Sequence, residues 1–216
     1  MASATTANWN GRNGIHDRAR SVVRPIMEAS GFVVDHHGAE FADGLSELVQ
    51  TQDDRCSLML RYRPDLVCVK QQVRSLLCEV KGKEFNPARY AAPEFIIEAR
   101  SLKGLWEWNA GGRVAMVACV AFLPDGRQRV RATWADAIWT PRTILVPERW
   151  DFADQWQSMK MMFPTAELKR VMYRPDRGSG TPYCMVPDGL LTDIDSFIGV
   201  ELLGAKHRQG RLAIFG

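Results

Sequence analysis

The chain has 216 residues, of which 46% are hydrophobic and 25% are charged, as is ordinary for a globular protein. The formal net charge of +3 permits nucleic-acid binding without requiring it. No apolar run is long enough to cross a membrane, and the first residues lack the apolar core of a secretion signal. We therefore expect a cytoplasmic protein with no membrane partner.

The five cysteines form no CxxC pair and no spacing typical of a zinc site. Three of them, Cys68, Cys78 and Cys119, lie within apolar runs that resemble strands. We expect these to be small buried thiols in a reducing compartment.

The chain opens with small polar residues at positions 1–13, which we expect to be a flexible N-terminus. Apolar residues then recur at helical spacing, namely Ile15, Ala19, Val22, Val23 and Ile26. This spacing predicts a helix over residues 15–30 that ends at Gly31. A short strand follows at residues 32–34, and then a polar segment at residues 36–54.

Residues 61–83 contain two short apolar runs, at residues 66–69 and 76–80, with a polar turn at residues 70–75 between them. This pattern predicts a β-hairpin. Because the start of one antiparallel strand lies beside the end of the next, the outer ends of the two runs are expected to be neighbours.

Charged residues occupy those two outer ends. Pro64-Asp65 opens the first run, and Glu79-Val80-Lys81 closes the second, so Asp65 and Glu79 are expected to lie side by side. Because side chains alternate along a strand, Glu79 and Lys81 share one face while Val80 points to the other. Two acids and a lysine are costly to gather at one strand rim unless a metal uses them.

A turn follows at residues 86–93, and Pro93 suits the first position of a helix. The apolar residues after it predict that helix, namely Phe95, Ile96, Ala99, Leu102, Leu105 and Trp106. Residues 114–122 form an almost continuous apolar run, which indicates a strand covered on both faces. After a turn at residues 124–126, residues 127–134 predict a returning strand.

The remainder, residues 135–216, is rich in proline and less regular. We expect short strands near residues 143–146 and 183–186, and short helices near residues 151–162 and 192–203. We interpret this part as an elaboration packed on the core.

The hairpin motif resembles that of the PD-(D/E)XK nuclease superfamily. Pro64-Asp65 is followed by Glu79-Val80-Lys81, and the predicted order of helix, three strands, helix and strand matches the family's αβββαβ core. The resemblance implies an α/β, restriction-endonuclease-like fold with a mixed central sheet flanked by helices. It places the nuclease core at residues 14–134 and is closest in pattern to Holliday-junction-resolvase-like members.

The resemblance also implies site roles. Asp65, Glu79 and the backbone carbonyl of Val80 would hold Mg²⁺ or Mn²⁺, and Lys81 would position or deprotonate the attacking water.

Family members usually carry a further acid in the first helix. Asp17 is a candidate for that acid, Glu28 lies at the other end of the helix, and Glu40 and Glu47 in the following segment compete with both.

Basic residues after the second turn form an alternating pattern. Arg127, Arg129 and Arg131 would share one face of a strand, as a stripe that contacts phosphates or as a solvated edge that prevents aggregation. Lys83 is either an exposed loop charge or another phosphate contact.

The function that these features favour is a metal-dependent DNA endonuclease. A structure-selective or junction-resolving activity on duplex or branched DNA is the preferred subtype, and a homodimer in DNA repair, recombination or a phage is expected from the resemblance. Two alternatives stay open. One is a catalytically inactive module on the same fold that binds nucleic acid or protein, and the other is a nuclease directed at RNA.

Overall fold

The computed structural model describes residues 4–36, 63–71, 75–109, 112–138, 171–172, 183–186 and 188–204. No helix within this part is long and apolar enough to span a membrane. Several predictions lie outside the described residues, namely most of the polar segment at 36–54, the strand near 143–146 and the helix near 151–162.

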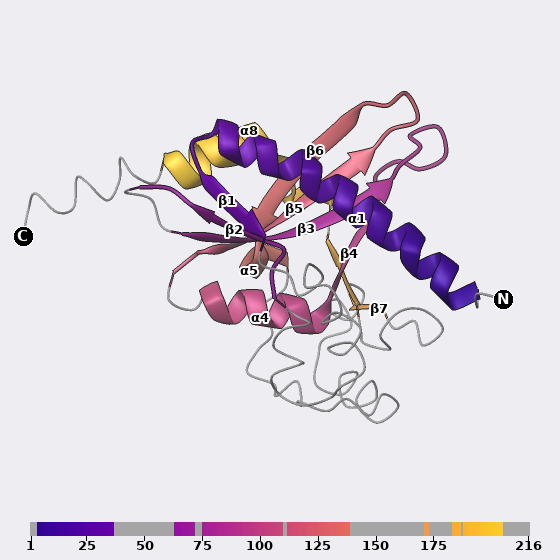
Figure 1. Cartoon of the computed structure of the whole chain (residues 1–216), viewed down its shortest axis with the longest axis horizontal. Coiled ribbons are helices and arrows are strands. Elements are labelled where there is room, and N and C mark those ends of the chain that lie inside the picture. Colours follow the sequence, from indigo (N-terminus) through magenta and orange to yellow (C-terminus); the bar gives the residue numbers. More distant parts are fainter. Residues whose placement is uncertain are drawn as a thin grey trace, which may run out of the picture.

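The main sheet is mixed, and its strand order is β1-β2-β3-β5-β6-β9 (Figure 1). Strands β3 and β5 pair in parallel, whereas the other neighbours are antiparallel. The strands are β1 (Val33–His36), β2 (Leu66–Val69), β3 (Leu76–Glu84), β5 (Ala115–Phe122), β6 (Gln128–Trp134) and β9 (Thr192–Asp193).

Helices lie on both faces of this sheet (Figure 1). One face carries α1 (Ala4–Ala29), α8 (Ile194–Phe197) and the π-helix η3 (Ile198–Leu203), and the other carries α4 (Ala99–Asn109) and α5 (Ala135–Ile138). The predicted fold class, an α/β structure with a mixed central sheet flanked by helices, is confirmed.

Helix α1 begins at Ala4, so the predicted start at residue 15 was wrong. No proline interrupts residues 4–14, and adding turns to an existing helix costs far less than nucleating one. The packed part of α1 lies further along, where Ala19, Val23 and Met27 recur every fourth residue and are fully buried.

The end of α1 is where the sequence predicts it. Gly31 has a φ of +85°, its N–H donates to the Glu28 carbonyl, and the Phe32 N–H donates to the Met27 carbonyl. This pair of bonds is the Schellman arrangement, which satisfies the last helical carbonyls and turns the chain into β1.

The region after Pro93 differs from the prediction. Residues Phe95–Glu98 form strand β4, and helix α4 begins only at Ala99. Phe95 and Ile97 are buried while Ile96 is exposed, which is the alternation of a strand. The strand forms because β4 pairs antiparallel with β8 (Tyr183–Val186), a partner far along the chain.

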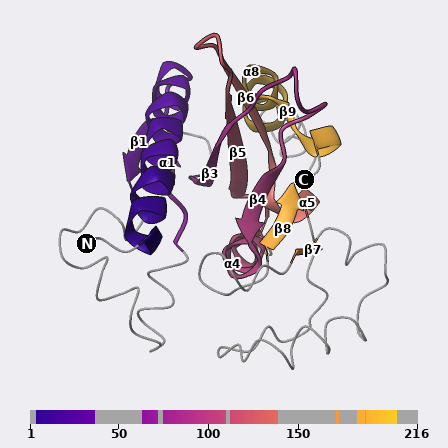
Figure 2. The ribbon, with the colours of Figure 1, turned by 90° about the vertical axis from the view of Figure 1, so that its right-hand side faces the viewer.

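A three-stranded sheet results, with the order β4-β8-β7, where β7 is Val171–Met172. Figure 2 shows β4 and β8 beside α4, with the main sheet between them and α1. The predicted strand at residues 183–186 is confirmed, and the predicted helix near residues 192–203 appears as β9, α8 and η3 together. The described residues after 134 thus supply strands to both sheets.

Strand β5 separates the two hydrophobic cores. All eight of its residues are buried, which confirms the prediction of a strand covered on both faces. Even-numbered residues such as Met116 pack under α1 and α8, and odd-numbered ones such as Val117 pack under α4 and the small sheet. Cys68, Cys78 and Cys119 are free and buried, as expected.

Candidate active site

The hairpin of β2 and β3 brings Asp65 to the middle of β3. Leu66 pairs with Cys78, so Asp65 comes next to Glu79, and an Asp65 carboxylate oxygen accepts the Val80 N–H at 2.6 Å. The predicted proximity of the hairpin's outer ends is confirmed. The sequence analysis ended the second strand of the hairpin at Glu79-Val80-Lys81, and this end was wrong. Strand β3 continues to Glu84, paired with β5, beyond the part of β3 that pairs with β2.

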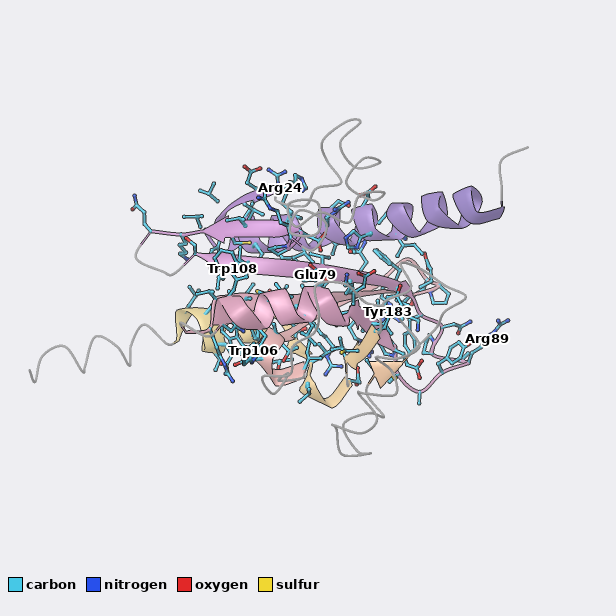
Figure 3. All side chains as sticks on the ribbon, turned by 90° about the horizontal axis from the view of Figure 1, so that it is seen from below. Arg24, Glu79, Arg89, Trp106, Trp108 and Tyr183 are labelled. Carbon is cyan, nitrogen blue, oxygen red and sulfur yellow. The ribbon has the colours of Figure 1, made fainter. Side chains whose placement is uncertain are left out.

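Glu79 and Lys81 lie on one face of β3, as the alternation predicts. The Lys81 Nζ is 2.6 Å from Glu79 Oε1, whereas Val80 is buried in the core beneath α1. Figure 3 labels Glu79 on β3, between the ribbons of α1 and α4. Asp65 and Glu79 are each only 5% exposed, so two carboxylates are buried close to each other.

Helix α1 supplies two cation-forming side chains that the sequence analysis missed. His16 Nε2 lies 2.8 Å from Asp65 Oδ1, and a guanidinium nitrogen of Arg20 lies 3.4 Å from the same oxygen. The two residues are four apart and therefore share a face of the helix. That spacing was visible in the sequence, but the surface that this face meets was not.

A glycine in β3 lets α1 approach this closely. A Cβ on Gly82 would lie 2.8 Å from the Ile15 carbonyl oxygen and 2.9 Å from the Ala19 Cβ. Real Cβ atoms essentially never make contacts that short, so only glycine fits here unless the helix moves away. Because residue 82 is a glycine, the α1 backbone beside His16 can pack directly against the strand that carries Glu79 and Lys81.

The two buried acids have opposite pKa shifts. Burial acts to raise the pKa of Asp65, but the hydrogen bond from His16, the charge of Lys81 and the Val80 N–H together lower it below 3.8. Burial raises the pKa of Glu79 to about 7, and the Asp65 charge adds to the rise while Lys81 opposes it. Glu79 therefore titrates near neutrality, as groups at functional sites often do.

Lys81 stays protonated at neutral pH. Burial acts to lower its pKa, but the charges of Glu79 and Asp65 outweigh burial and raise the pKa. In this state the ammonium group donates hydrogen bonds and supplies positive charge.

The described residues include no group of three His, Cys, Asp or Glu side chains placed to hold a metal ion. The oxygen atoms that could ligate a metal here are those of the Asp65 and Glu79 carboxylates and of the Val80 carbonyl. The Val80 carbonyl lies on the same edge of β3 as the Val80 N–H, which donates to Asp65. Mg²⁺ is commonly bound through one or two carboxylates, with waters and substrate phosphates as the other ligands. These hard oxygen donors fit a hydrated Mg²⁺ or Mn²⁺.

The candidate acids of the first helix contact arginines, and the Arg20 guanidinium that contacts Asp17 also contacts Asp65. Asp17 has a side chain that is 60% exposed and contacts Arg20, and Glu28 pairs with Arg24. Glu40 and Glu47 lie outside the described residues.

The three arginines of the predicted stripe have different surroundings. Arg129 and Arg131 share a face of β6, opposite Ala121 and Cys119. Arg131 holds Asp188 at 2.5 Å and donates to the Leu191 carbonyl. Arg129 is exposed.

The other two basic candidates have short-range partners. Arg127, just before β6, is exposed and pairs with Asp125 at 2.6 Å. The Lys83 Nζ donates to the Glu94 carbonyl at 2.8 Å. Arg127 and Arg129 are thus at the surface. Lys83 binds the segment just before β4, and Arg131 binds the segment just before β9.

No family model and no curated protein matches this chain. Among solved structures, a Holliday junction resolvase from the archaeal hyperthermophile Archaeoglobus fulgidus is similar to 59% of this chain over 78% of its own. The two are 16% identical, with a TM-score of 0.33. A likeness at this level leaves the function to be derived from the side chains of the site.

Proposed function

We propose that the protein is a metal-dependent DNA endonuclease of the PD-(D/E)XK superfamily, with Asp65, Glu79 and Lys81 as its catalytic residues. The observation that carries the proposal is the pair of buried carboxylates on neighbouring strands, with Asp65 held by the Val80 N–H and Lys81 2.6 Å from Glu79. Asp65 lies just before β2, and Glu79 and Lys81 lie on the neighbouring strand β3, which supports the same proposal.

Asp65 and Glu79, with the Val80 carbonyl, would hold a divalent ion, which when bound polarises the phosphate and lowers the pKa of water. Glu79 must lose its proton to act as a ligand, and a pKa near 7 makes that loss inexpensive at neutral pH. Lys81, protonated and on the same face, would orient the attacking water and offset negative charge on the phosphate oxygens. Its raised pKa supports the positioning role over that of a general base.

A second candidate is a nucleic-acid-binding module on the same fold without catalysis. Asp65 is already contacted by Arg20 and hydrogen-bonded to His16, and Glu79 is paired with Lys81, so an arginine and a lysine of the protein balance the two acids. A site neutralised in this way can persist without a metal.

The finer properties belong to the same proposal. We expect activity on branched DNA before continuous duplex, action as a homodimer that cuts two strands, and Mg²⁺ or Mn²⁺ as the cofactor. RNA as the substrate is the competing possibility.

One experiment separates these functions. Branched DNA, duplex DNA, single-stranded DNA and RNA of matched sequence are incubated with the protein in Mg²⁺, in Mn²⁺ and in EDTA. We expect cleavage of DNA that depends on the metal and is lost in Lys81→Ala. Full activity in Lys81→Ala, or in Asp65→Asn, contradicts the site, and binding without cleavage by the wild type supports the module.

A further inference from the structure

The loop between β3 and β4, residues 85–94, is anchored at both ends. The Phe85 N–H donates to the Phe122 carbonyl at 2.9 Å, and Phe85 and Phe95 at its two ends are buried in the core under α4. Lys83 of β3 binds the Glu94 carbonyl at 2.8 Å. The two ends of the loop are therefore held to the strand that carries Glu79 and Lys81.

The tip of this loop has a defined backbone. The Asn86 carbonyl accepts the N–H groups of Arg89 and Tyr90, at 3.0 and 3.2 Å, and the Asn86 side chain accepts the Ala88 N–H at 3.0 Å. Tyr90 is nonetheless 64% exposed, and Arg89 is exposed and extends away from the ribbons in Figure 3. An aromatic ring on an ordered backbone loses little conformational entropy when it binds.

Further cations lie at the same end of the main sheet. Glu84, the last residue of β3, pairs with Phe122 of β5, and Phe122 pairs with Gln128 of β6. The exposed Arg127 and Arg129, on either side of Gln128, therefore lie at this end of the sheet too. The one described acid of β3 at this end, Glu84, is matched by an ion pair from Arg18 at 2.8 Å. Arg127 is already paired with Asp125, so Arg89 and Arg129 are the exposed arginines to consider with Tyr90 at this end of the sheet. Exposed arginines together with an exposed aromatic ring are typical of surfaces that bind single-stranded nucleic acid.

The distance along β3 between the candidate site and this loop limits which nucleotides of one strand the two can contact at the same time. Glu79 and Glu84 are five positions apart in β3, which at about 3.3 Å per residue is about 17 Å. Stacked nucleotides rise about 3.4 Å each along a strand, so the end of β3, where the loop begins, lies about five nucleotides from a phosphate held at Asp65 and Glu79. The tip of the loop runs on beyond the end of β3 (Figure 1), so five nucleotides is the minimum separation for Tyr90.

We propose that Tyr90 and Arg89 form a second nucleic-acid contact. The Tyr90 ring stacks on an unpaired base at least about five nucleotides from the phosphate at the site, and Arg89 binds a phosphate beside that base. The assignment deepens the proposed function and rests on it for the position of the scissile phosphate. It specifies the substrate class as nucleic acid with unpaired bases or a branch point, because bases inside a continuous duplex offer no free face.

Binding is measured by fluorescence anisotropy in EDTA, so that no cleavage occurs, with single-stranded, branched and duplex DNA. Tyr90→Ala is expected to raise Kd for single-stranded and branched DNA about tenfold, and for duplex DNA less than about twofold. Tyr90→Phe keeps the ring and should retain wild-type affinity. Arg89→Ala is expected to lower the slope of log Kd against log salt by about one.

Trp108 provides the matched control. It is 60% exposed on α4 and lies next to Asn109, whose side chain binds Ala115 at the opposite end of β5. Trp108→Ala should leave binding unchanged. Equal losses in Trp108→Ala and Tyr90→Ala, an unchanged Kd in Tyr90→Ala, or no DNA binding by the wild type would each overturn the contact.

A photo-crosslinking residue placed at Tyr90 then measures the footprint. Crosslinks centred on one position about five or more nucleotides from the cut support the assignment, and crosslinks spread along the DNA or centred at the cut contradict it. If the wild type binds and depends on Tyr90 but never cleaves with Mg²⁺ or Mn²⁺, the endonuclease proposal fails while the contact stands.

Discussion

Asp65 and Glu79 are buried to the same extent, yet their pKa values shift in opposite directions. Asp65 accepts hydrogen bonds from His16 and from the Val80 N–H, both of which stabilise the carboxylate. Within the described part of the chain, Glu79 pairs with Lys81, and it also faces the Asp65 charge. Burial alone therefore does not decide which acid is ionised; the number of donors around each one does.

Because their pKa values differ, Asp65 and Glu79 are expected to have different roles in binding a metal ion. Asp65 is charged at every pH at which the protein is expected to work, so it can recruit a cation. Glu79 is close to its midpoint at neutral pH, so it can be neutral without a metal and charged with one. Each of the following experiments tests this contrast.

The largest expected effect is on cleavage. If the proposed function holds, Lys81→Ala should lower kcat by about 10² to 10⁴, because it would remove the group proposed to orient the water and balance charge. Lys70→Ala is the control, since Lys70 lies in the same hairpin but binds the Ser30 carbonyl at the end of α1. Comparable losses in both variants would mean that Lys81 acts through stability alone.

Opposite pH dependences of stability are expected for the two acids. The folded pKa of Glu79 is raised from 4.5 to about 7, so its stabilisation is fully present below pH 4.5 and is lost as pH rises through 7. Glu79→Gln should therefore gain stability relative to wild type over that window, on the order of 3 kcal/mol. The folded pKa of Asp65 is below 3.8, so the loss in Asp65→Asn should be constant above that pH and shrink below it.

Urea unfolding of the metal-free protein from pH 2.5 to 8, followed by tryptophan fluorescence, measures both profiles. Glu94→Gln changes an exposed acid next to β4 and should follow the wild-type curve. Parallel profiles for Asp65→Asn and Glu79→Gln would refute the contrast.

His16 should account for much of the low pKa of Asp65. His16→Ala removes a hydrogen bond to a buried carboxylate and is expected to cost about 1.5 to 3 kcal/mol at pH 7 and to raise the pKa of Asp65. NMR titration of the Asp65 carboxyl gives the pKa directly. His36→Ala, on exposed strand β1, should change neither quantity.

Metal binding should be coupled to the proton on Glu79. Below pH 7 a divalent ion must displace that proton, so Mn²⁺ affinity is expected to rise about tenfold per pH unit up to 7 and then level off. Calorimetry in two buffers of different ionisation enthalpy measures the released proton. In Glu79→Gln no such release should occur; binding with an unchanged proton count would exclude Glu79 as a ligand.

The sequence by itself determined the local arrangement of the hairpin. Its two apolar runs define β2 and the start of β3, and alternation along β3 puts Glu79 and Lys81 on one face. The unbroken apolar run at 115–122 likewise identified the central strand. These features depend on neighbours in the chain, so the pattern of residue types is sufficient to predict them.

The tertiary structure decided what surrounds the site. Phe95–Glu98 became a strand because its partner is β8, and His16 reached Asp65 because Gly82 lets α1 approach β3. Both depend on surfaces that are distant in sequence and meet only when the core packs. The ionisation of Asp65 and Glu79 follows from the same contacts, since desolvation and hydrogen bonding act on the side chains only after they are buried.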